Sequence, residues 1–259
     1  MNFMLSRENR IIKDALKLKQ RKYREKEGLF LIEGIRFIEE AIKSESIKYV
    51  LYSSKVYETK GYERILNSLI DKYEISNELL KELTDTENPQ GAIGIVHKKI
   101  WSIDDIENNL IVVCDGIQDP GNLGTIIRTC DAAFGAVVVI KGSVDVYNSK
   151  TLRSTMGSIF HVPIVFYDDF KIAVENIKNK GYSLYAADLE ADKYIYDVDF
   201  RKKSAIIIGN EANGIPCEHI ELVDEKIKIP MIGKAESLNA SVAAGVIIYE
   251  VVRQRFCTT

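Results

Sequence analysis

The chain has 259 residues, of which 46% are apolar and 28% are charged, and its formal net charge is −3. This length suggests one or two domains of roughly 150 residues each, and the composition is that of an ordinary globular protein with a sizeable core. The longest apolar stretch, residues 132–140, is interrupted by Gly135 and is far shorter than the roughly 20 residues of a membrane span. Because no apolar signal region precedes the first charges, we expect a cytoplasmic protein.

The four cysteines and three histidines form no metal-binding or thiol-redox pattern. No Cys-x-x-Cys pair occurs, and the histidines are too scattered for a zinc site. Cys114 ends an apolar strand pattern and Cys130 lies in a helical pattern, so we expect both to be buried as small apolar side chains. We therefore expect no metal.

Charge is unevenly distributed along the chain. Residues 1–28 carry nine Lys or Arg and four Asp or Glu, so this segment is +5 and the rest is −8. We predict a basic first helix, which on an acidic body could contact the phosphates of RNA. The alternative is a solvated amphipathic helix that only buries its apolar side, residues 11, 12, 15, 16 and 18.

The residues after this helix predict a compact αβ domain, and we place its end in the polar segment 101–109. The predicted domains are therefore 1–103 and 104–259. In the first domain, the predicted strands are 29–32, 49–52, 74–75 and 92–96, and the predicted helices are 35–42, 63–70 and 77–83.

The second domain alternates continuous apolar strands with helices. This pattern predicts an α/β fold, with a parallel sheet covered by helices on both faces. The predicted strands are 110–114, 136–140, 164–166, 183–186, 205–208 and 226–229, and the predicted helices are 125–133, 149–158, 170–180 and 239–252.

Residues 115–129 follow a buried strand and open into a helix. A turn containing Pro120 and Gly124 presents Asn122, with Arg128 about one helical turn further on. We expect both side chains to point at the carboxyl end of the strand, where open α/β sheets bind ligands. The alternative is a plain connection in which Asn122 caps the helix and Arg128 lies on the surface.

A second polar turn follows the strand 205–208. Gly209 has no side chain, so a ligand could approach the backbone closely there. The carboxylate of Glu211 could pair with a cation or orient a hydroxyl group, with Asn210 and Asn213 beside it. The alternative is a loop whose polar side chains only satisfy backbone amides.

The third segment, residues 228–250, ends a strand and begins a helix near Ser237 or Asn239. Alanines at positions 240, 243 and 244 recur at helical spacing, so one face of this helix carries unusually small side chains. We expect another part of the structure to pack very closely against this face. The alternative is that Ser237 or Asn239 only caps the helix and the alanines seat it on the sheet.

Together the three segments resemble, in order, the signature motifs of the SpoU/TrmH family of RNA ribose 2′-O-methyltransferases, in the SPOUT superfamily. The resemblance covers residues 110–252 strongly, including 153–157 and 161–163. It extends more weakly to 1–100, which is similar at 30–34 and 89–91 to an accessory RNA-binding domain. The motifs match as Asn122-Leu-Gly-x-x-x-Arg128, Gly209-x-Glu211-x-x-Gly214 and Ile229-Pro-Met-x-x-x-x-Glu-Ser-Leu-Asn-x-Ser-Val-Ala-Ala-Gly.

The resemblance implies a parallel α/β domain whose C-terminal part forms a deep trefoil knot, preceded by a smaller αβ (L30e-like) domain. It implies S-adenosylmethionine as the cofactor, held by Gly209, Ile229 and Leu238. The absence of a Gly-x-Gly-x-x-Gly fingerprint fits a site that is not of the Rossmann type. The positions that match the family's catalytic residues are Arg128, Asn122, Glu211, Ser237 and Asn239.

The implied reaction is methyl transfer to a ribose 2′-hydroxyl in RNA. Family precedent gives the hydroxyl proton to Arg128. Since arginine has a pKa above about 12, we expect a charged Arg128 that stabilises the developing alkoxide or contacts a phosphate. The resemblance also implies a homodimer whose basic first helix contacts RNA phosphates through Arg21, Lys22 and Arg24.

The fused front domain favours 23S ribosomal RNA as the substrate, and transfer RNA is the alternative. A non-catalytic RNA-binding dimer is the rival interpretation, but such a scaffold has no need of the five polar motif residues. A nucleotide-dependent enzyme is disfavoured because the chain has no Gly-x-x-x-x-Gly-Lys-Ser/Thr motif. The choice between housekeeping modification and antibiotic resistance stays open.

Overall fold

The computed structural model describes residues 4–256, which divide into two compact units. The first comprises the chain up to Lys99 together with Tyr147–Phe160, and the second comprises Ile100–Val146 and the chain from His161 onward. The sequence-based boundary at residues 103 and 104 differs from this division, which assigns the segment Tyr147–Phe160 to the first unit.

The first unit is built on a four-stranded sheet with the order β1-β4-β2-β3. Strand β4 runs antiparallel to both β1 and β2, whereas β2 and β3 are parallel. The strands are β1 (Leu29–Glu33), β2 (Ile47–Tyr52), β3 (Lys72–Glu74) and β4 (Ala92–His97). The helices are α1 (Arg10–Lys17), α2 (Arg21–Glu27), α3 (Ile35–Lys43), α4 (Tyr62–Leu66), α5 (Asn77–Leu83) and α7 (Ser149–Thr155), with 3-10 turns η1 (Ser54–Glu58) and η3 (Ser158–Phe160).

The predicted single basic helix is instead two short helices, α1 and α2. Helix α1 is capped by the side chain of Asn9 at its start and by Leu18 at its end, and α2 is capped at its end by Gly28, which adopts the left-handed conformation that favours glycine (φ 63°). The buried side of α1 packs with α5 and the sheet in one apolar core. This packing confirms the apolar face that the sequence predicted.

The second unit contains a seven-stranded sheet with the order β7-β6-β5-β10-β8-β11-β9, and all its strand pairs are parallel. The strands are β5 (Leu110–Cys114), β6 (Ala136–Ile140), β7 (Ile164–Tyr167), β8 (Ser183–Ala187), β9 (Lys193–Tyr194), β10 (Ser204–Ile208) and β11 (Glu225–Lys228). The helices are α6 (Pro120–Ala132), α8 (Phe170–Asn179), α9 (Cys217–Ile220) and α10 (Ala240–Phe256), with 3-10 turns η2 (Ile103–Asp105) and η4 (Ile195–Asp197). The parallel sheet expected from the sequence is confirmed.

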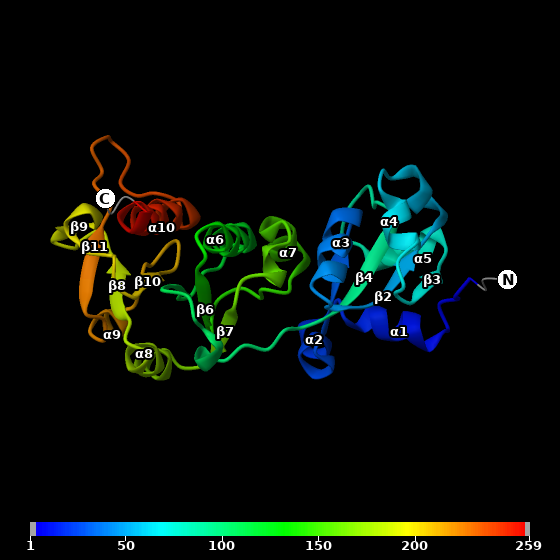
Figure 1. The fold of residues 1–259 in the computed structure, drawn as a ribbon, viewed down its shortest axis with the longest axis horizontal. Helices are drawn as coiled ribbons and strands as arrows, with labels where there is room; N and C mark the ends of the chain where they lie inside the picture. The colour runs from blue at the N-terminus through cyan, green and yellow to red at the C-terminus, as the bar shows by residue number, and fades with distance from the viewer. Residues whose placement is uncertain (1–3, 257–259) are drawn as a thin grey trace. The chain divides into compact units, whose positions relative to one another are not determined.

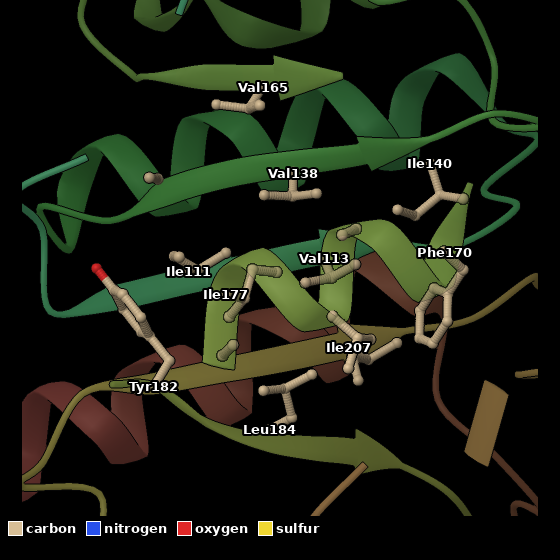
Figure 2. Packing of buried hydrophobic residues seen from close by; sticks show 14 of the residues in the cluster. Ile111, Val113, Val138, Ile140, Val165, Phe170, Ile177, Tyr182, Leu184 and Ile207 are labelled. Atoms are coloured by element: carbon tan, nitrogen blue, oxygen red, sulfur yellow. The ribbon is translucent and has the colours of Figure 1, made fainter. Parts of the chain in front are cut away.

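Helices cover both faces of this sheet. Helices α6 and α10 lie together on one face, and α8 lies on the other (Figure 1). Figure 2 shows the core under α8, where Val113, Val138 and Ile207 from three neighbouring strands point at Phe170 and Ile177 of the helix. Each such side chain contributes roughly 1.5–3 kcal/mol when it is fully buried.

Helix α6 begins five residues earlier than predicted. The side chain of Asp119 accepts a hydrogen bond from the backbone N–H of Asn122, and Pro120 occupies the first helical position. The predicted turn around Asn122 is therefore the first turn of the helix. Strand β9 and helix α9 were not predicted, because two and four residues are too short to show a periodicity. The trefoil knot stays a prediction.

Both cysteines that were expected to be buried, Cys114 and Cys130, are fully buried. Burial, followed by the nearby charges of Asp115 and Glu211, raises the pKa of the Cys114 thiol to about 12. Cys217 is exposed, and Cys257 lies outside the described residues. None of the helices formed by residues 4–256 has the length and apolar character of a membrane span.

Candidate functional site

The second unit carries a pocket of about 410 Å³ where several parallel strands end. This volume falls within the roughly 300–1,000 Å³ of small-molecule sites, and the carboxyl edge of an open α/β sheet is where such sites form. The pocket is lined by Ala187, Asp188 and Leu189 after β8; by Gly209–Ala212 and Gly214 after β10; by Ile229, Met231 and Ser237–Asn239 after β11; and by Ala240, Ala243 and Ile247 of α10.

The turn after β10 leaves no room for a side chain at Gly209. A Cβ atom there would lie 2.4 Å from the backbone carbon of Gly214. Asn210 and Gly214 exchange two backbone hydrogen bonds of 3.0 and 2.9 Å, and the side chain of Asn210 accepts further bonds from two backbone N–H groups of the turn. The backbone of Gly209 therefore forms part of the pocket wall in a fixed conformation.

The carboxylate of Glu211 connects this turn to the start of α6. It accepts hydrogen bonds from the backbone N–H groups of Gln118 and Asp119, both at 3.0 Å, and from the side-chain amide of Asn122 at 2.9 Å. Burial alone would raise the pKa of the Glu211 carboxyl. These three hydrogen bonds outweigh burial, so the pKa lies below its ordinary value of 4.5.

A second contact fixes the same two loops. The side-chain amide of Asn210 donates a 2.8 Å hydrogen bond to the carbonyl of Gly116, just after β5. The loops after β5 and β10 are adjacent because β5 and β10 are paired in the sheet. The structure thus brings together Asn122 and Glu211, which are 89 positions apart in the sequence.

The third motif supplies the loop before α10 and the first turn of that helix. Asn239 caps α10, since its side chain accepts hydrogen bonds from the backbone N–H groups of Ser241 (2.9 Å) and Val242 (3.3 Å). Ser237 and Leu238 are exposed in the preceding loop and line the pocket. Ala240 and Ala243 of α10 also line the pocket, whereas Ala244 is fully buried and is not among the lining residues.

Arg128 differs in exposure from Asn122, the other motif residue of α6. Both Asn122 and Arg128 belong to α6, and six residues along a helix place two side chains about 120° apart. Asn122 is buried against Glu211, whereas Arg128 is exposed and is not among the residues that line the pocket. The contact with Glu211 places Asn122 at the end of β5, and the same placement of Arg128 stays a prediction.

The three cations proposed to contact RNA occupy different environments in α2. Arg21 and Lys22 are exposed, and Arg21 forms a 2.6 Å ion pair with Glu25. Arg24 is only 8% exposed and donates hydrogen bonds to the carbonyls of Leu18 and Lys19, both at 2.8 Å. Arg24 thus holds the end of α1 in place, and we retain only Arg21 and Lys22 as candidates for phosphate contact.

Sequence reasoning missed two features of the second unit. Asp188 and Leu189 line the pocket although no motif marks them; the signal was their position directly after a predicted strand. The buried carboxylate of Asp115 lies 2.7 Å from Nδ1 of His219, whose ring stacks on Phe170 at 4.0 Å. Nothing in the spacing of Asp115 and His219 indicated this pair.

The second unit is an open parallel sheet with a small-molecule pocket at its carboxyl edge, and the chain also carries a separate αβ unit. This is the architecture of a two-domain α/β protein with a small-molecule site. The chain belongs to the SpoU rRNA methylase family, whose model matches residues 109–249. The model for the MRM3-like substrate binding domain matches residues 9–94. The family resemblance inferred from the motifs is confirmed.

Relatives of similar length carry the same two regions. The chain is 37% identical over 249 residues to the 23S rRNA (guanosine(2553)-2'-O)-methyltransferase RlmP of Bacillus subtilis, covering 94% of this chain and 96% of the relative. It is 32% identical over 250 residues to the 23S rRNA (uridine(2479)-2'-O)-methyltransferase of Streptomyces viridochromogenes, covering 92% of this chain and 87% of that relative.

A solved structure extends the likeness to the fold. The SpoU methyltransferase AviRb from Streptomyces viridochromogenes, in complex with the cofactor AdoMet, superposes with a TM-score of 0.85 at 29% identity. The match covers 96% of this chain and 99% of AviRb. The α/β fold of the family is therefore the fold of this protein.

Proposed function

We propose that this protein transfers a methyl group from S-adenosylmethionine to a ribose 2′-hydroxyl in 23S ribosomal RNA. Family membership and the substrates named for the Bacillus and Streptomyces relatives support this activity. The observation that carries it is the meeting of three motif segments at one edge of the sheet. Asn122 is bonded to Glu211, and Glu211 lines the same pocket as Ser237 and Asn239. A cytoplasmic location follows from a ribosomal RNA substrate in bacteria such as those relatives.

The pocket fits S-adenosylmethionine in size and in the chemistry of its walls. Gly209 exposes a backbone that no side chain can cover, and Ile229 and Leu238 add apolar surface suited to an adenine ring. Asp188 provides a carboxylate for the cationic or hydroxyl groups of such a ligand. When bound, this cofactor supplies an electrophilic methyl group on a sulfonium.

The 2′-hydroxyl oxygen forms a bond to that methyl carbon, the carbon–sulfur bond breaks, and the hydroxyl proton leaves to solvent or a nearby acceptor. In our proposal Arg128 stays protonated and stabilises the developing negative charge on the ribose oxygen or an adjacent phosphate. Arg128 is exposed, and no hydrogen bond or ion pair to its side chain occurs among residues 4–256. Its guanidinium is therefore accessible to RNA.

The other four motif residues position the site. Glu211 holds the start of α6 against the turn after β10 through its three hydrogen bonds, and Asn122 supplies one of them. Asn239 fixes the start of α10. Ser237, exposed in the pocket wall, is free to hydrogen-bond to the ribose. Accurate positioning of two reactants alone can lower a barrier by several kcal/mol, up to roughly 7–11 kcal/mol.

The first test is methyl transfer from labelled S-adenosylmethionine to unmodified 23S ribosomal RNA and, separately, to bulk transfer RNA. Digestion of the product should yield a 2′-O-methylated nucleotide from ribosomal RNA. Label only in transfer RNA would overturn the proposed substrate. No label in either pool together with no cofactor binding would favour a non-catalytic RNA-binding protein.

Arg128→Lys tests the proposed role of the arginine. This substitution keeps the charge but removes the planar guanidinium, so turnover should fall at least about tenfold while cofactor binding is unchanged. Arg201→Lys is the matched control, because Arg201 is an exposed arginine of the same unit that pairs with Asp199. Normal turnover of Arg128→Lys would remove Arg128 from the mechanism.

We also propose that the protein forms a homodimer through α10. Val242, Tyr249 and Phe256 recur every seven residues along one face and are 51%, 53% and 85% exposed. Exposed apolar side chains gathered on one helix face are typical of protein interfaces. Tyr249→Asp should convert the dimer to a monomer in sedimentation or light-scattering measurements. Ile172→Asp on α8, at a residue that is also 53% exposed, should leave it intact.

A further inference from the structure

A second cavity, of about 130 Å³, lies within the first unit. Its inner walls are apolar and come from the first core and from α7, including Leu31, Leu83, Ile93 and Leu152. At its opening lie Lys19, Asp85 and Arg153, which are exposed. Arg153 belongs to the 153–157 segment of the family resemblance, to which the methyl-transfer site gives no function.

A buried hydroxyl group of this cavity has no partner. Thr84 lines the cavity and is only 8% exposed, and within residues 4–256 nothing hydrogen-bonds to its Oγ1 atom. Buried hydroxyl groups almost always have a partner, because leaving one unsatisfied is costly. The neighbouring carbonyl of Thr84 is already used, since it accepts a bond from the ammonium group of Lys19. A ligand in the cavity would supply the missing partner for Oγ1.

The size and charges of the cavity define the ligand. A cavity of about 150 Å³ accommodates a benzene molecule, so about 130 Å³ suits a single six-membered ring and is too small for two fused rings. The buried guanidinium of Arg24 and the carboxylates of Glu33 and Asp85 also line the cavity, so its interior is not positively charged and does not favour a phosphate. The exposed guanidinium of Arg153 at the opening favours an anionic chain outside the cavity.

The existing contacts leave hydrogen-bonding capacity for a polar ring. Asp85 is held at the opening by a 2.9 Å ion pair to Lys19 and a hydrogen bond from Ser149. Glu33 accepts a hydrogen bond from Thr86 through Oε1, and its second oxygen can accept from a ring amino or imino group. An apolar ring face with polar edges, attached to an anionic chain, is the chemistry of a base in single-stranded RNA.

We propose that this cavity takes one unpaired pyrimidine base of the substrate RNA, which hydrogen-bonds to Thr84 while Arg153 contacts a flanking phosphate. The inference rests on the proposed function, in which the first unit binds RNA. It makes the cavity a specificity site, separate from the pocket of the second unit, that selects where the RNA is held.

Binding of short single-stranded RNA to the full-length protein tests this proposal. Oligocytidine and oligouridine should bind about tenfold tighter than an abasic oligoribonucleotide of the same length, which keeps the phosphates and removes the bases. Oligoadenosine should bind like the abasic strand. Equal affinity for all four strands would overturn the proposal.

Two variants localise the effect. Thr84→Val removes the hydroxyl at nearly constant volume, and Ser149→Phe fills the cavity from the first turn of α7. Both should abolish the preference for pyrimidines and leave the affinity for the abasic strand unchanged. Ser154→Phe, on the same helix but outside the cavity lining, is the matched control and should keep the preference. Retention of the preference in both cavity variants would overturn the proposal.

A direct measurement covers the case in which the variants fail to fold. With oligocytidine added to the wild-type protein, the methyl resonances of Leu83 and Leu152 should shift, whereas the abasic strand should leave them in place. Unchanged resonances would overturn the inference. If the wild-type protein methylates ribosomal RNA but shows no pyrimidine preference, this inference fails and the proposed function stands. If the protein neither methylates nor binds any RNA, the proposed function itself fails.

Discussion

Replacing Glu211 by glutamine tests whether one carboxylate holds the two motif loops together. In the wild type this carboxylate accepts three hydrogen bonds of 2.9–3.0 Å, from Gln118, Asp119 and Asn122. An amide has one oxygen, so in Glu211→Gln at least one donor faces an N–H group and loses its partner, and the remaining bonds lose their ionic character. The turn that carries Gly209 should therefore loosen.

The expected cost follows from these bonds. A hydrogen bond to a charged group contributes roughly 1.5–3 kcal/mol. Because Glu211 is partly in contact with solvent, which screens its charge, we expect a loss of about 1–2 kcal/mol for the whole substitution. In a protein of this size that corresponds to a decrease in Tm of about 2–8 °C. Glu175→Gln on α8, at an exposed glutamate, should change Tm by less than about 1 °C.

The dependence on pH gives a second, independent check. The pKa of Glu211 is lowered in the folded protein, so its contribution to stability is present above the unfolded pKa of about 4.3 and is lost as the pH falls through the folded value. The difference in free energy of unfolding between the wild type and Glu211→Gln should therefore be constant from about pH 6 to 8 and shrink below about pH 4.

Chemical denaturation across this pH range measures both the loss of stability in Glu211→Gln and the dependence of that loss on pH. Equal free energies of unfolding for the wild type and Glu211→Gln at pH 7 would refute the reasoning. A difference in free energy of unfolding that is as large at about pH 3 as at pH 7 would also refute it. Cofactor binding measured on the same samples should weaken in Glu211→Gln, since Glu211 lines the pocket.

Two further outcomes follow from the structure. Gly209→Ala should lower stability by about 1–3 kcal/mol and abolish cofactor binding, because its Cβ would overlap the backbone of Gly214. Thermal unfolding and cofactor binding measure these two effects. Gly233→Ala is the control and should behave like wild type in both, because nothing lies within 4 Å of the added Cβ. Cys217 should react with a thiol reagent in the native protein, whereas the buried Cys114, whose pKa is raised to about 12, should react only after unfolding. Peptide mapping by mass spectrometry distinguishes the two thiols, and labelling of native Cys114 would contradict its burial.

Local sequence signals predicted most elements, because each depends on a pattern within a few residues. Continuous apolar runs marked strands such as β5 and β6, and apolar residues at helical spacing marked α3. The errors have local causes as well. The Asp119 cap and Pro120 start α6 five residues before the apolar periodicity becomes visible, and β9 is too short to carry a pattern.

The sequence by itself determined the class of fold, the strand ends at which polar side chains gather, and the motifs that indicate methyl transfer. Only the tertiary structure decided which of those side chains meet. The bond between Asn122 and Glu211 exists because β10 inserts beside β5, a pairing across 94 residues that no local pattern encodes. The same holds for the cavity around Thr84, whose walls come from α7 and from segments more than fifty residues earlier in the chain. Such contacts depend on the packing of whole elements, whereas periodicity and caps depend only on neighbours in the chain.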